Sequence, residues 1–389
     1  DYKNVEGVDW QDQIYRPALT QDYNVSLSGG SKTAGNTYNI TAAYLNQDGI
    51  ITNVNFKRYN LRSNIDINIT PRLTFRFDVS GRIEKRHQPG VSAGSSDPTA
   101  SLDNGGKEYG YKNIVFYAIT ARPTTSPTLP DGTYIGYNNP LIARDKSGFN
   151  DKNSNYVQSK VSLEYQIPKV EGLVAKGMFS YDFSNTAQKL LTLPCNQATP
   201  QYGSVDDKGF VNMTYGPSPH SATGVNQLQE TSSSFSRYTY SVQFSYAHTF
   251  ASKHEVCGDI VWEQSGTTSK TFTAGKQNFV IVEIPDLNFS TEITPNSVNG
   301  YHSNTARHGL LARAGYIFDG KYIIQGSLRL DGSARFGRAH RYGLFPAISA
   351  GWKISEENFM SSTRSVIDNL KIRASYGKLG NDSIADFLY

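Results

Sequence analysis

The sequence lacks the features that mark helical membrane proteins and nucleic-acid-binding proteins. No run approaches the roughly 18 apolar residues of a transmembrane helix, and the mean hydropathy is −0.48. The net charge of +4 is small for 389 residues, and the lysines and arginines are dispersed. Helical membrane spans are therefore excluded, and we expect no nucleic-acid partner. The two cysteines, Cys195 and Cys257, are either free thiols or one disulfide.

Signatures of catalysis and of metal binding are also missing. The seven histidines show no HxxxH or HExxH spacing. Neighbouring carboxylates such as Glu356 and Glu357 would point to opposite sides of a strand. We therefore expect neither an enzyme nor a resident cofactor. The oxygen-rich residues 103–107 (DNGGK) and 145–153 (DKSGFNDKN) either bind Ca²⁺ or form plain Asx turns.

Long segments with alternating apolar and polar residues dominate what is present, and residues 321–352 contain two of them. Tyr322 and Leu328 fall on one face of an extended strand, and Arg329 falls on the other. After a loop rich in Gly and Arg the alternation resumes and continues to Trp352. This stretch predicts two long antiparallel strands, each apolar on one face only.

The same alternation predicts about twelve strands in the whole chain. They cover residues 21–30, 36–46, 58–69, 73–84, 157–167, 173–183, 238–246, 256–262, 310–318, 322–330, 344–352 and 370–376. Several are longer than the five or six residues usual in globular proteins. A tilted strand needs roughly 9–11 residues to cross a bilayer, so these lengths suit membrane-spanning strands.

The connections between these strands alternate in length. Those after the first, third, fifth, seventh and ninth strands are short, whereas most others are long and irregular, including residues 88–153 and 184–230 and a third connection that ends at about residue 303. Antiparallel strands put alternate connections at opposite ends of a sheet, and outer-membrane barrels have short turns at one end and long loops at the other. We therefore predict an all-β fold, an antiparallel transmembrane β-barrel. A soluble protein with several sheets is the alternative.

The positions of the arginines indicate which face of each predicted strand would meet water and which would meet lipid. An Arg that faces lipid near the bilayer midplane costs about 2–4 kcal/mol, and the arginines of the predicted strands fall on the less apolar face. The residues predicted to face a lumen are Arg58, Arg62, Asp66, Arg76, Asp78, Arg82 and Arg329. The residues predicted to face lipid or the membrane interface are Phe318, Tyr322, Leu328 and Trp352. The residues predicted to face the lumen have two possible roles. They either form ion pairs with a plug or with neighbouring strands, or they guide cargo through the lumen.

Four stretches resemble the SusC-like members of the TonB-dependent outer-membrane transporters of Bacteroidetes. They are VDWQDQIYRPALTQDYNVSLSGG at 8–30, LRLDGSARFG at 328–337, RYGLFPAISAGWKISEE at 341–357 and LKIRASYGKLGND at 370–382. The resemblance implies a barrel of roughly 22 strands with a plugged lumen. Residues 1–389 would supply about 12 of these strands, while the plug domain and the remaining strands are expected to lie outside this chain.

The resemblance also implies a function, in the outer membrane of a Gram-negative bacterium. A TonB complex, acting through the plug, would drive import of an oligosaccharide or a peptide, and a SusD-like surface lipoprotein would cap the barrel in contact with outer-membrane lipid. Two alternatives stand beside it. One is a passive or structural outer-membrane barrel, and the other is a secreted carbohydrate-binding β protein.

Aromatic and amide side chains in the first long connection are candidates for cargo binding. Sugars are bound by aromatic faces together with polar hydrogen-bonding groups. The candidates are Tyr109, Tyr111, Tyr134, Tyr137, Asn138 and Asn139. Their alternative role is to hold the connection itself together.

Overall fold

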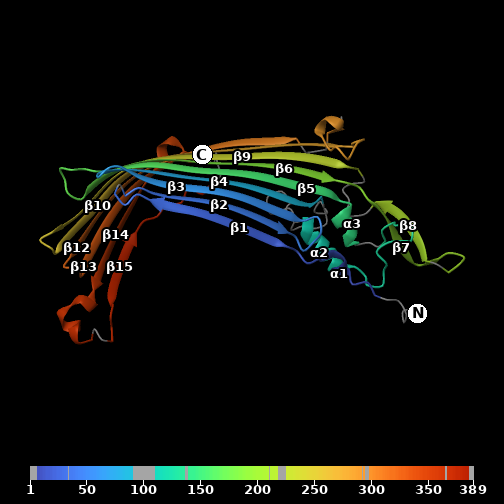
Figure 1. Cartoon of the computed structure of the whole chain (residues 1–389), viewed down its shortest axis with the longest axis horizontal. Helices are drawn as coiled ribbons and strands as arrows, with labels where there is room; N and C mark the ends of the chain where they lie inside the picture. The colour runs from blue at the N-terminus through green and yellow to red at the C-terminus, as the bar shows by residue number, and fades with distance from the viewer. Residues whose placement is uncertain are drawn as a thin grey trace.

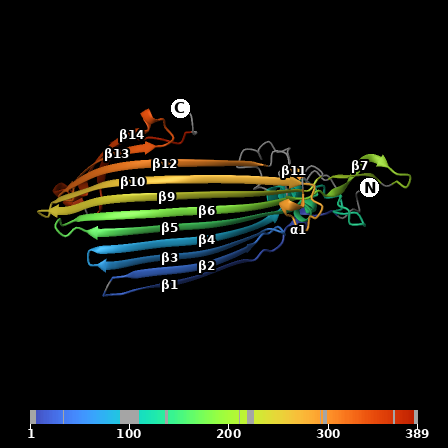
Figure 2. The ribbon, with the colours of Figure 1, turned by 90° about the horizontal axis from the view of Figure 1, so that it is seen from above.

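The chain folds into one large antiparallel sheet whose strands follow one another in chain order, as Figures 1 and 2 show. The structure, a computed structural model, describes residues 7–33, 35–90, 110–135, 139–209, 211–217, 225–290, 292–293, 298–363 and 366–384. The continuous path of the sheet consists of β1 (Thr20–Gly30), β2 (Thr37–Asp48), β3 (Asn55–Thr70), β4 (Leu73–Pro89), β5 (Gly148–Gln166), β6 (Leu173–Thr192), β9 (Gln227–Phe250), β10 (His254–Gln277), β12 (Asn299–Phe318), β13 (Tyr322–Ser333), β14 (Tyr342–Lys353) and β15 (Lys371–Gly377). The predicted all-β architecture of about twelve antiparallel strands is confirmed.

Tight turns join the strands at one end of the sheet. β12 and β13 are connected through Asp319 and Gly320, whose φ angles are 50° and 66°, and the Lys321 N–H donates to the Phe318 carbonyl at 2.9 Å. Two consecutive residues with positive φ fit the right-handed twist of the flanking strands. This tight turn is therefore enough to join β12 and β13.

The cross-strand register carries one polar face through the whole sheet. Asp66 on β3 lies opposite Arg76 on β4, and Asp259 on β10 lies opposite Arg313 on β12. Directly opposite residues project from the same face, so the pairings can be followed from β1 to β15. On this reckoning one face carries Arg58, Arg62, Asp66, Arg76, Asp78, Arg82 and Arg329. The opposite face carries Phe318, Tyr322, Leu328 and Trp352.

Several strands extend further into the long-loop end than predicted. β6 continues to Thr192 and β9 begins at Gln227, so the predicted connection 184–230 is too long, as is the one predicted to end at about residue 303. In these extensions most residues on both faces are polar, with exceptions such as Leu191 and Leu228, which pack with Phe279. The alternation therefore disappears while the pairing persists. Hydroxyl groups there meet across strands, with the Thr231 and Thr273 oxygens 3.1 Å apart.

The long-loop end also carries short elements that were not predicted (Figure 1). They are the helices α1 (Trp10–Ile14), α2 (Gly110–Thr120) and α3 (Pro140–Asp145), the hairpin of β7 (Asn196–Val205) and β8 (Val211–Pro217), the short strand β11 (Glu292–Ile293) and the 3₁₀ turns η2 (Leu287–Phe289) and η3 (Arg338–His340). At the opposite end, η4 (Ile354–Glu356) and η5 (Asn358–Thr363) lie between β14 and β15. Each of the short helices is too small to form without local capping or packing.

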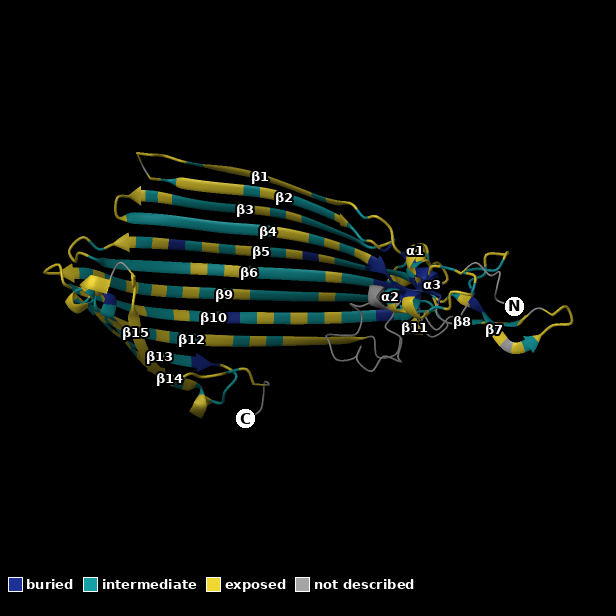
Figure 3. Cartoon of the chain, turned by 90° about the horizontal axis from the view of Figure 1, so that it is seen from below, coloured by how far each residue is buried: buried dark blue, intermediate teal, exposed yellow. Residues whose placement is uncertain are grey.

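The main cluster of buried apolar residues lies among these helices rather than along the sheet. Trp10 and Ile14 from α1 pack with Ile114 from α2, Ala143 from α3 and Ile51. In Figure 3 the dark blue of buried residues gathers at the helices, while most of each strand is teal or yellow. Within the described ranges, no helix is long and apolar enough to cross a membrane.

Candidate functional site

The apolar face of the sheet is exposed across all twelve strands. Leu27 is 60% exposed on β1, Leu163 46% on β5 and Ile348 54% on β14. Twelve strands spaced about 4.8 Å apart, with an apolar band about 25 Å tall, give an area on the order of 1,000 Å². Soluble monomers rarely expose a contiguous apolar patch of more than a few hundred Å². The face is therefore built for a lipid environment or another apolar partner.

A row of aromatic side chains crosses this face at the tight-turn end. Ring contacts link β10, β12, β13 and β14, and a further pair of rings lies on β9. The ring centroids are 4.5 Å apart for His248 and Phe250, 5.1 Å for His254 and Phe318, 6.3 Å for Phe318 and Tyr322, and 6.5 Å for Tyr322 and Trp352. Such a row is typical of the girdle that sits at a membrane–water interface.

A second group of aromatic and imidazole rings lies on the same face, farther toward the long-loop end. Trp262 and Tyr342 both contact His308, with centroids 6.0 and 6.4 Å apart. His308 and Phe318 are about ten residues apart on β12, which is about 34 Å along a strand and roughly 26 Å once a tilt of about 40° is included. That spacing matches the apolar band of outer-membrane barrels.

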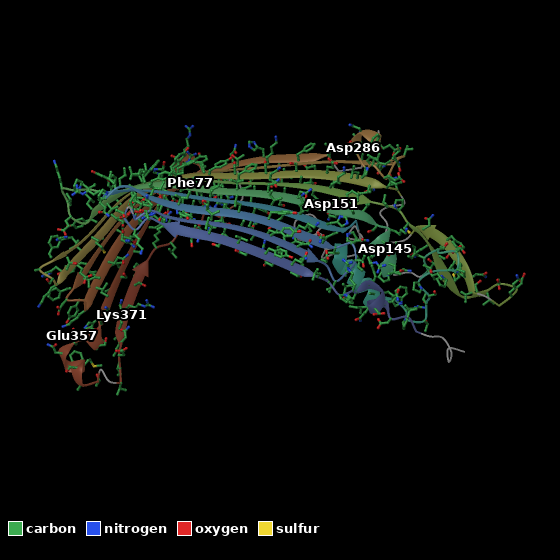
Figure 4. The ribbon with its side chains drawn as sticks, in the orientation of Figure 1. Phe77, Asp145, Asp151, Asp286, Glu357 and Lys371 are labelled. Carbon is green, nitrogen blue, oxygen red and sulfur yellow. The ribbon has the colours of Figure 1, made fainter. Side chains whose placement is uncertain are left out.

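The aromatic row is fixed to a polar group beyond the strands. Tyr322 Oη donates to the Glu357 carboxylate at 2.6 Å, and Trp352 Nε1 donates to the same oxygen at 3.0 Å. These hydrogen bonds, with the nearby charge of Lys321, lower the pKa of Glu357. Figure 4 shows Glu357 at the end of the molecule opposite Asp145 and Asp286. The polar tips of both rings are thus hydrogen-bonded to one carboxylate that lies beyond the strands.

The polar face carries ion pairs across β3, β4 and β5. Arg76 lies 2.6 Å from Glu164 on β5 and 3.6 Å from Asp66 on β3. Asp78 accepts a hydrogen bond from Asn64 at 2.5 Å and lies 3.4 Å from Lys160. The structure thus brings Asp66, Arg76 and Asp78 into cross-strand pairs.

The other arginines that were predicted to face the lumen on β3 and β4 differ in the contacts they make. Arg82 pairs with Glu84 on its own strand at 3.2 Å and lies 4.1 Å from the centre of the Tyr156 ring. Arg62 donates to Asn64 at 3.1 Å. The buried Nε of Arg58 has no hydrogen-bond partner in the described residues.

A second network lies on the polar face of β9, β10 and β12. Asp259 accepts from both Nε and Nη2 of Arg313, from the Ser245 hydroxyl at 2.8 Å and from Gln243 at 3.3 Å. Four hydrogen bonds hold this carboxylate in place, and charge-assisted hydrogen bonds of this kind are stronger than neutral ones. The network ties three strands together on the side away from the apolar face.

Beside that network the polar face is hollowed into a cavity of about 840 Å³. Its floor comes from β9, β10, β12 and β13, and its walls come from the β13–β14 loop and residues 380–382. The charged and aromatic lining consists of Arg237, Glu263, Arg307, Arg329, Asp331, Arg335, Arg341, Asp382, Phe235, Phe336, Phe345, Tyr342, His308 and His340. This volume lies within the 300–1,000 Å³ typical of ligand pockets.

The cavity depends on residues that were not predicted as candidates, apart from Arg329. The β13–β14 loop was identified as rich in Gly and Arg, but nothing in its spacing shows that residues 380–382 close over it. The contact is made by Arg307, which holds Asp382 with hydrogen bonds of 2.7 and 2.8 Å. These two residues are far apart in sequence, so the alternation pattern carries no signal for their pairing.

The predicted cargo-binding residues fall partly outside the described residues. Tyr109, Tyr137 and Asn138 lie there, and of Tyr111 the structure gives only the backbone position in α2. Tyr134 is half-buried next to the helices, and burial raises its pKa. The cargo-binding role of this set stays a prediction.

Asn139 is the best defined of the predicted set. Its side chain is 1% exposed, caps α3 by accepting from the Leu141 N–H at 3.0 Å, and donates to the Pro127 and Ile135 carbonyls at 2.7 and 2.9 Å. All of these bonds stabilise the connection itself. A direct contact between Asn139 and cargo would require breaking one of them.

The cysteines and the oxygen-rich segments show other contacts. Cys195 and Cys257 are free thiols, and burial raises the pKa of Cys195. Residues 103–107 lie outside the described part of the chain. In residues 145–153, Asp145 pairs with Arg144 at 2.6 Å and Asp151 pairs with His87 at 2.6 Å. The described residues contain no cluster of three His, Cys, Asp or Glu side chains that suits a metal ion.

Comparison with known proteins identifies proteins similar to almost the whole chain. No family model matches it. TonB-dependent receptor P39 of Formosa agariphila is 29% identical over 98% of the chain, and TonB-dependent receptor SusC of Bacteroides thetaiotaomicron is 24% identical over 97%. The resemblance to SusC-like TonB-dependent receptors is confirmed. The chain spans 32% and 35% of the length of these two receptors, about a third of each.

Solved structures show the same fold as this receptor-like chain. A structure of the RagAB peptide transporter covers 99% of the chain at a TM-score of 0.71 and 21% identity. The RagAB peptide importer in its open-open state covers 98% at a TM-score of 0.71 and 21% identity. The chain corresponds to 39% and 38% of those two chains. The twelve-stranded sheet therefore has the fold of the corresponding segment of those chains.

Proposed function

We propose that this chain forms part of the wall of an outer-membrane barrel that imports an oligosaccharide or a peptide with energy from a TonB complex. The observation that carries the proposal is the continuous polar face that lies opposite an exposed apolar face across twelve strands. The apolar face suits lipid, and the polar face suits a wet lumen. In this proposal residues 1–389 are barrel wall, and a plug domain and further strands belong to the rest of a longer protein.

The energy source and the partners rest on the similar proteins. Relatives named TonB-dependent receptors support coupling to a TonB complex through a plug. The RagAB structures are those of a peptide transporter and support a peptide as one class of cargo. A SusD-like surface lipoprotein is the proposed lid, and the long-loop end, with its helices and the β7–β8 hairpin, is the end at which it would bind.

Ion pairing on the polar face supports transport rather than catalysis. The carboxylates of the two networks described there are paired with arginine, Glu164 with Arg76 and Asp259 with Arg313. Such pairs fix the wall without creating a nucleophile and base pair. We therefore propose a protein without enzymatic activity, whose lumen residues Arg58, Arg62 and Arg82 contact a plug or cargo.

Uptake measurements test this proposal. The natural protein is expressed in cells that do or do not contain a functional TonB complex, and the uptake of labelled oligopeptides and oligosaccharides is followed. We expect uptake of one class that is lost without the TonB complex. Uptake that persists without it would indicate a passive pore instead, and the absence of uptake in both strains would indicate a structural barrel. Recovery of the protein in a detergent-free soluble fraction would contradict the outer-membrane assignment.

A further inference from the structure

The cavity on the polar face has an excess of positive charge. Its lining contains five arginines, Arg237, Arg307, Arg329, Arg335 and Arg341, against three carboxylates, Glu263, Asp331 and Asp382. The arginines come from β9, β12, β13 and the β13–β14 loop, so the fold gathers them from segments far apart in sequence. Their charge in a recessed site raises the local concentration of anions.

Three of these arginines are already committed to neighbouring groups. Arg307 holds Asp382 with two hydrogen bonds. Arg329 donates from Nε to Asp331 at 2.7 Å. Arg335 donates to the carbonyls of Asp382 and Ile384 at 3.2 and 3.3 Å, which fixes the wall formed by residues 380–382.

Asp382 is held in its ionised form. Burial alone would raise its pKa, but hydrogen bonds from Arg307 and Ser333, together with the charges of Arg307 and Arg335, lower it overall. Its negative charge is therefore compensated by Arg307 and Arg335, and it does not neutralise Arg237 or Arg341. The wall is a built feature of the folded chain rather than a loose terminus.

Arg237 and Arg341 have no carboxylate partner in the described part of the chain. The described contact of Arg237 is with the Phe235 ring, whose centre lies 5.4 Å from the guanidinium carbon. Arg341 has a buried Nε with no hydrogen-bond partner there. A buried guanidinium nitrogen without a partner is costly, because its desolvation is not compensated. An anion in the cavity would supply the missing acceptor.

We propose that this cavity binds a carboxylate group of the cargo through Arg237 and Arg341. The inference rests on the proposed import function and adds a charge requirement to it. A planar guanidinium binds a carboxylate through two parallel hydrogen bonds, which favours this anion over a merely diffuse negative charge. Phe235 and Phe336 in the same lining offer apolar contact for the part of the cargo that carries the carboxylate. A peptide and an acidic sugar both supply such a group.

The site is tested by titrating citrate, a tricarboxylate, into the detergent-purified natural protein at low ionic strength and measuring heat. We expect Arg237→Gln and Arg341→Gln each to raise the Kd for citrate at least about fivefold, because each removes a charged partner. The matched control is Arg338→Gln, an exposed arginine of the same loop that does not line the cavity, and it should leave the Kd unchanged. Triethyl citrate, which is neutral, should not bind.

Absence of citrate binding, or a Kd that Arg341→Gln leaves unchanged, would overturn the proposal. Competition then identifies the source of the carboxylate. A tetrapeptide is compared with its C-terminal amide, and a galacturonic acid trisaccharide with its methyl ester. Displacement of citrate by one acid and not by its neutral counterpart supports the proposal and names the cargo class. If neither acid displaces citrate, the cavity serves an anion other than cargo and the proposal fails.

These results are separable from those on import. TonB-dependent uptake with no citrate binding would leave the import function standing and remove the carboxylate site. Citrate binding that follows the arginine substitutions, in a protein whose uptake does not need TonB, would remove the import function instead. Each experiment therefore has its own readout.

Discussion

The two ends of the sheet are built on different physical principles. At the tight-turn end the strands are apolar on one face and polar on the other, and Tyr322 and Trp352 donate hydrogen bonds to Glu357 at the edge of that band. At the long-loop end most residues on both faces of the strands are polar, hydroxyl groups meet across strands, and apolar residues pack in two small cores, one around Trp10 and Ile114 and one around Leu191 and Leu228. The first end is organised by the contrast between its two faces, and the second by its own packing.

The strongest test of this difference removes the core of the long-loop end. Trp10→Ala should cost about 3–5 kcal/mol of local stability, as is usual for a buried Trp, because Trp10 is 4% exposed and its Nε1 donates to the Arg122 carbonyl at 2.9 Å. Amide hydrogen exchange should accelerate in α2 and α3 and remain slow in β12 and β13. The control Phe116→Ala changes a residue that is 59% exposed. Faster exchange throughout the sheet would show that the two ends are not independent.

The next test places a charge on the apolar face. Leu328→Arg should destabilise the protein by about 2–4 kcal/mol when it is refolded into lipid vesicles, because an Arg is placed in the apolar band. The control Gln325→Arg changes a residue of the same strand on the polar face and should have a much smaller effect. Equal effects in a urea titration would mean that the two faces do not meet different solvents.

A smaller effect is expected for the cap of α3. Asn139→Ala should cost about 1–3 kcal/mol, since it leaves the Leu141 N–H and the Pro127 and Ile135 carbonyls without their buried partner. Proteolysis of the connection between β4 and β5 should become faster. Ser126→Ala, which removes one exposed hydrogen bond to the Thr128 carbonyl in the same connection, is the control. Lost cargo binding with unchanged proteolysis would point to a ligand contact rather than a structural role.

The smallest effect is a dependence on pH at the tight-turn end. Hydrogen bonds from Tyr322 and Trp352 lower the pKa of Glu357, so their contribution to stability is present above the unfolded pKa of about 4.3 and is lost as the pH falls through the lower folded value. The fluorescence of Trp352 should therefore change below about pH 4. Glu357→Gln should abolish that change, and an unaltered pH profile in this variant would show that the contact does not hold the ring.

Prediction from the sequence was correct where the two faces of a strand differ in polarity. The alternation through Tyr59 and Leu61 against Arg58 and Arg62 predicted the strand and the face of each residue, because side chains of a strand project alternately to its two sides. The same rule ended β6 too early and began β9 too late, since the polar extensions of these strands toward the long-loop end have no continuous apolar face. Helices α1 and α3 were missed because they are only one or two turns long and depend on caps and packing.

The candidate site likewise has features that the sequence predicted and features that it did not. The sequence by itself determined which residues share the polar and apolar faces, the order of the twelve strands and the end that carries tight turns, because these follow from local period and chain direction. Only the tertiary structure decided that Asp382 closes over Arg307, that Asp259 joins three strands, and that Arg237 and Arg341 line one cavity. These contacts join residues tens to more than a hundred positions apart. The register and the curvature of the sheet decide which of these residues meet, and no local sequence pattern predicts either.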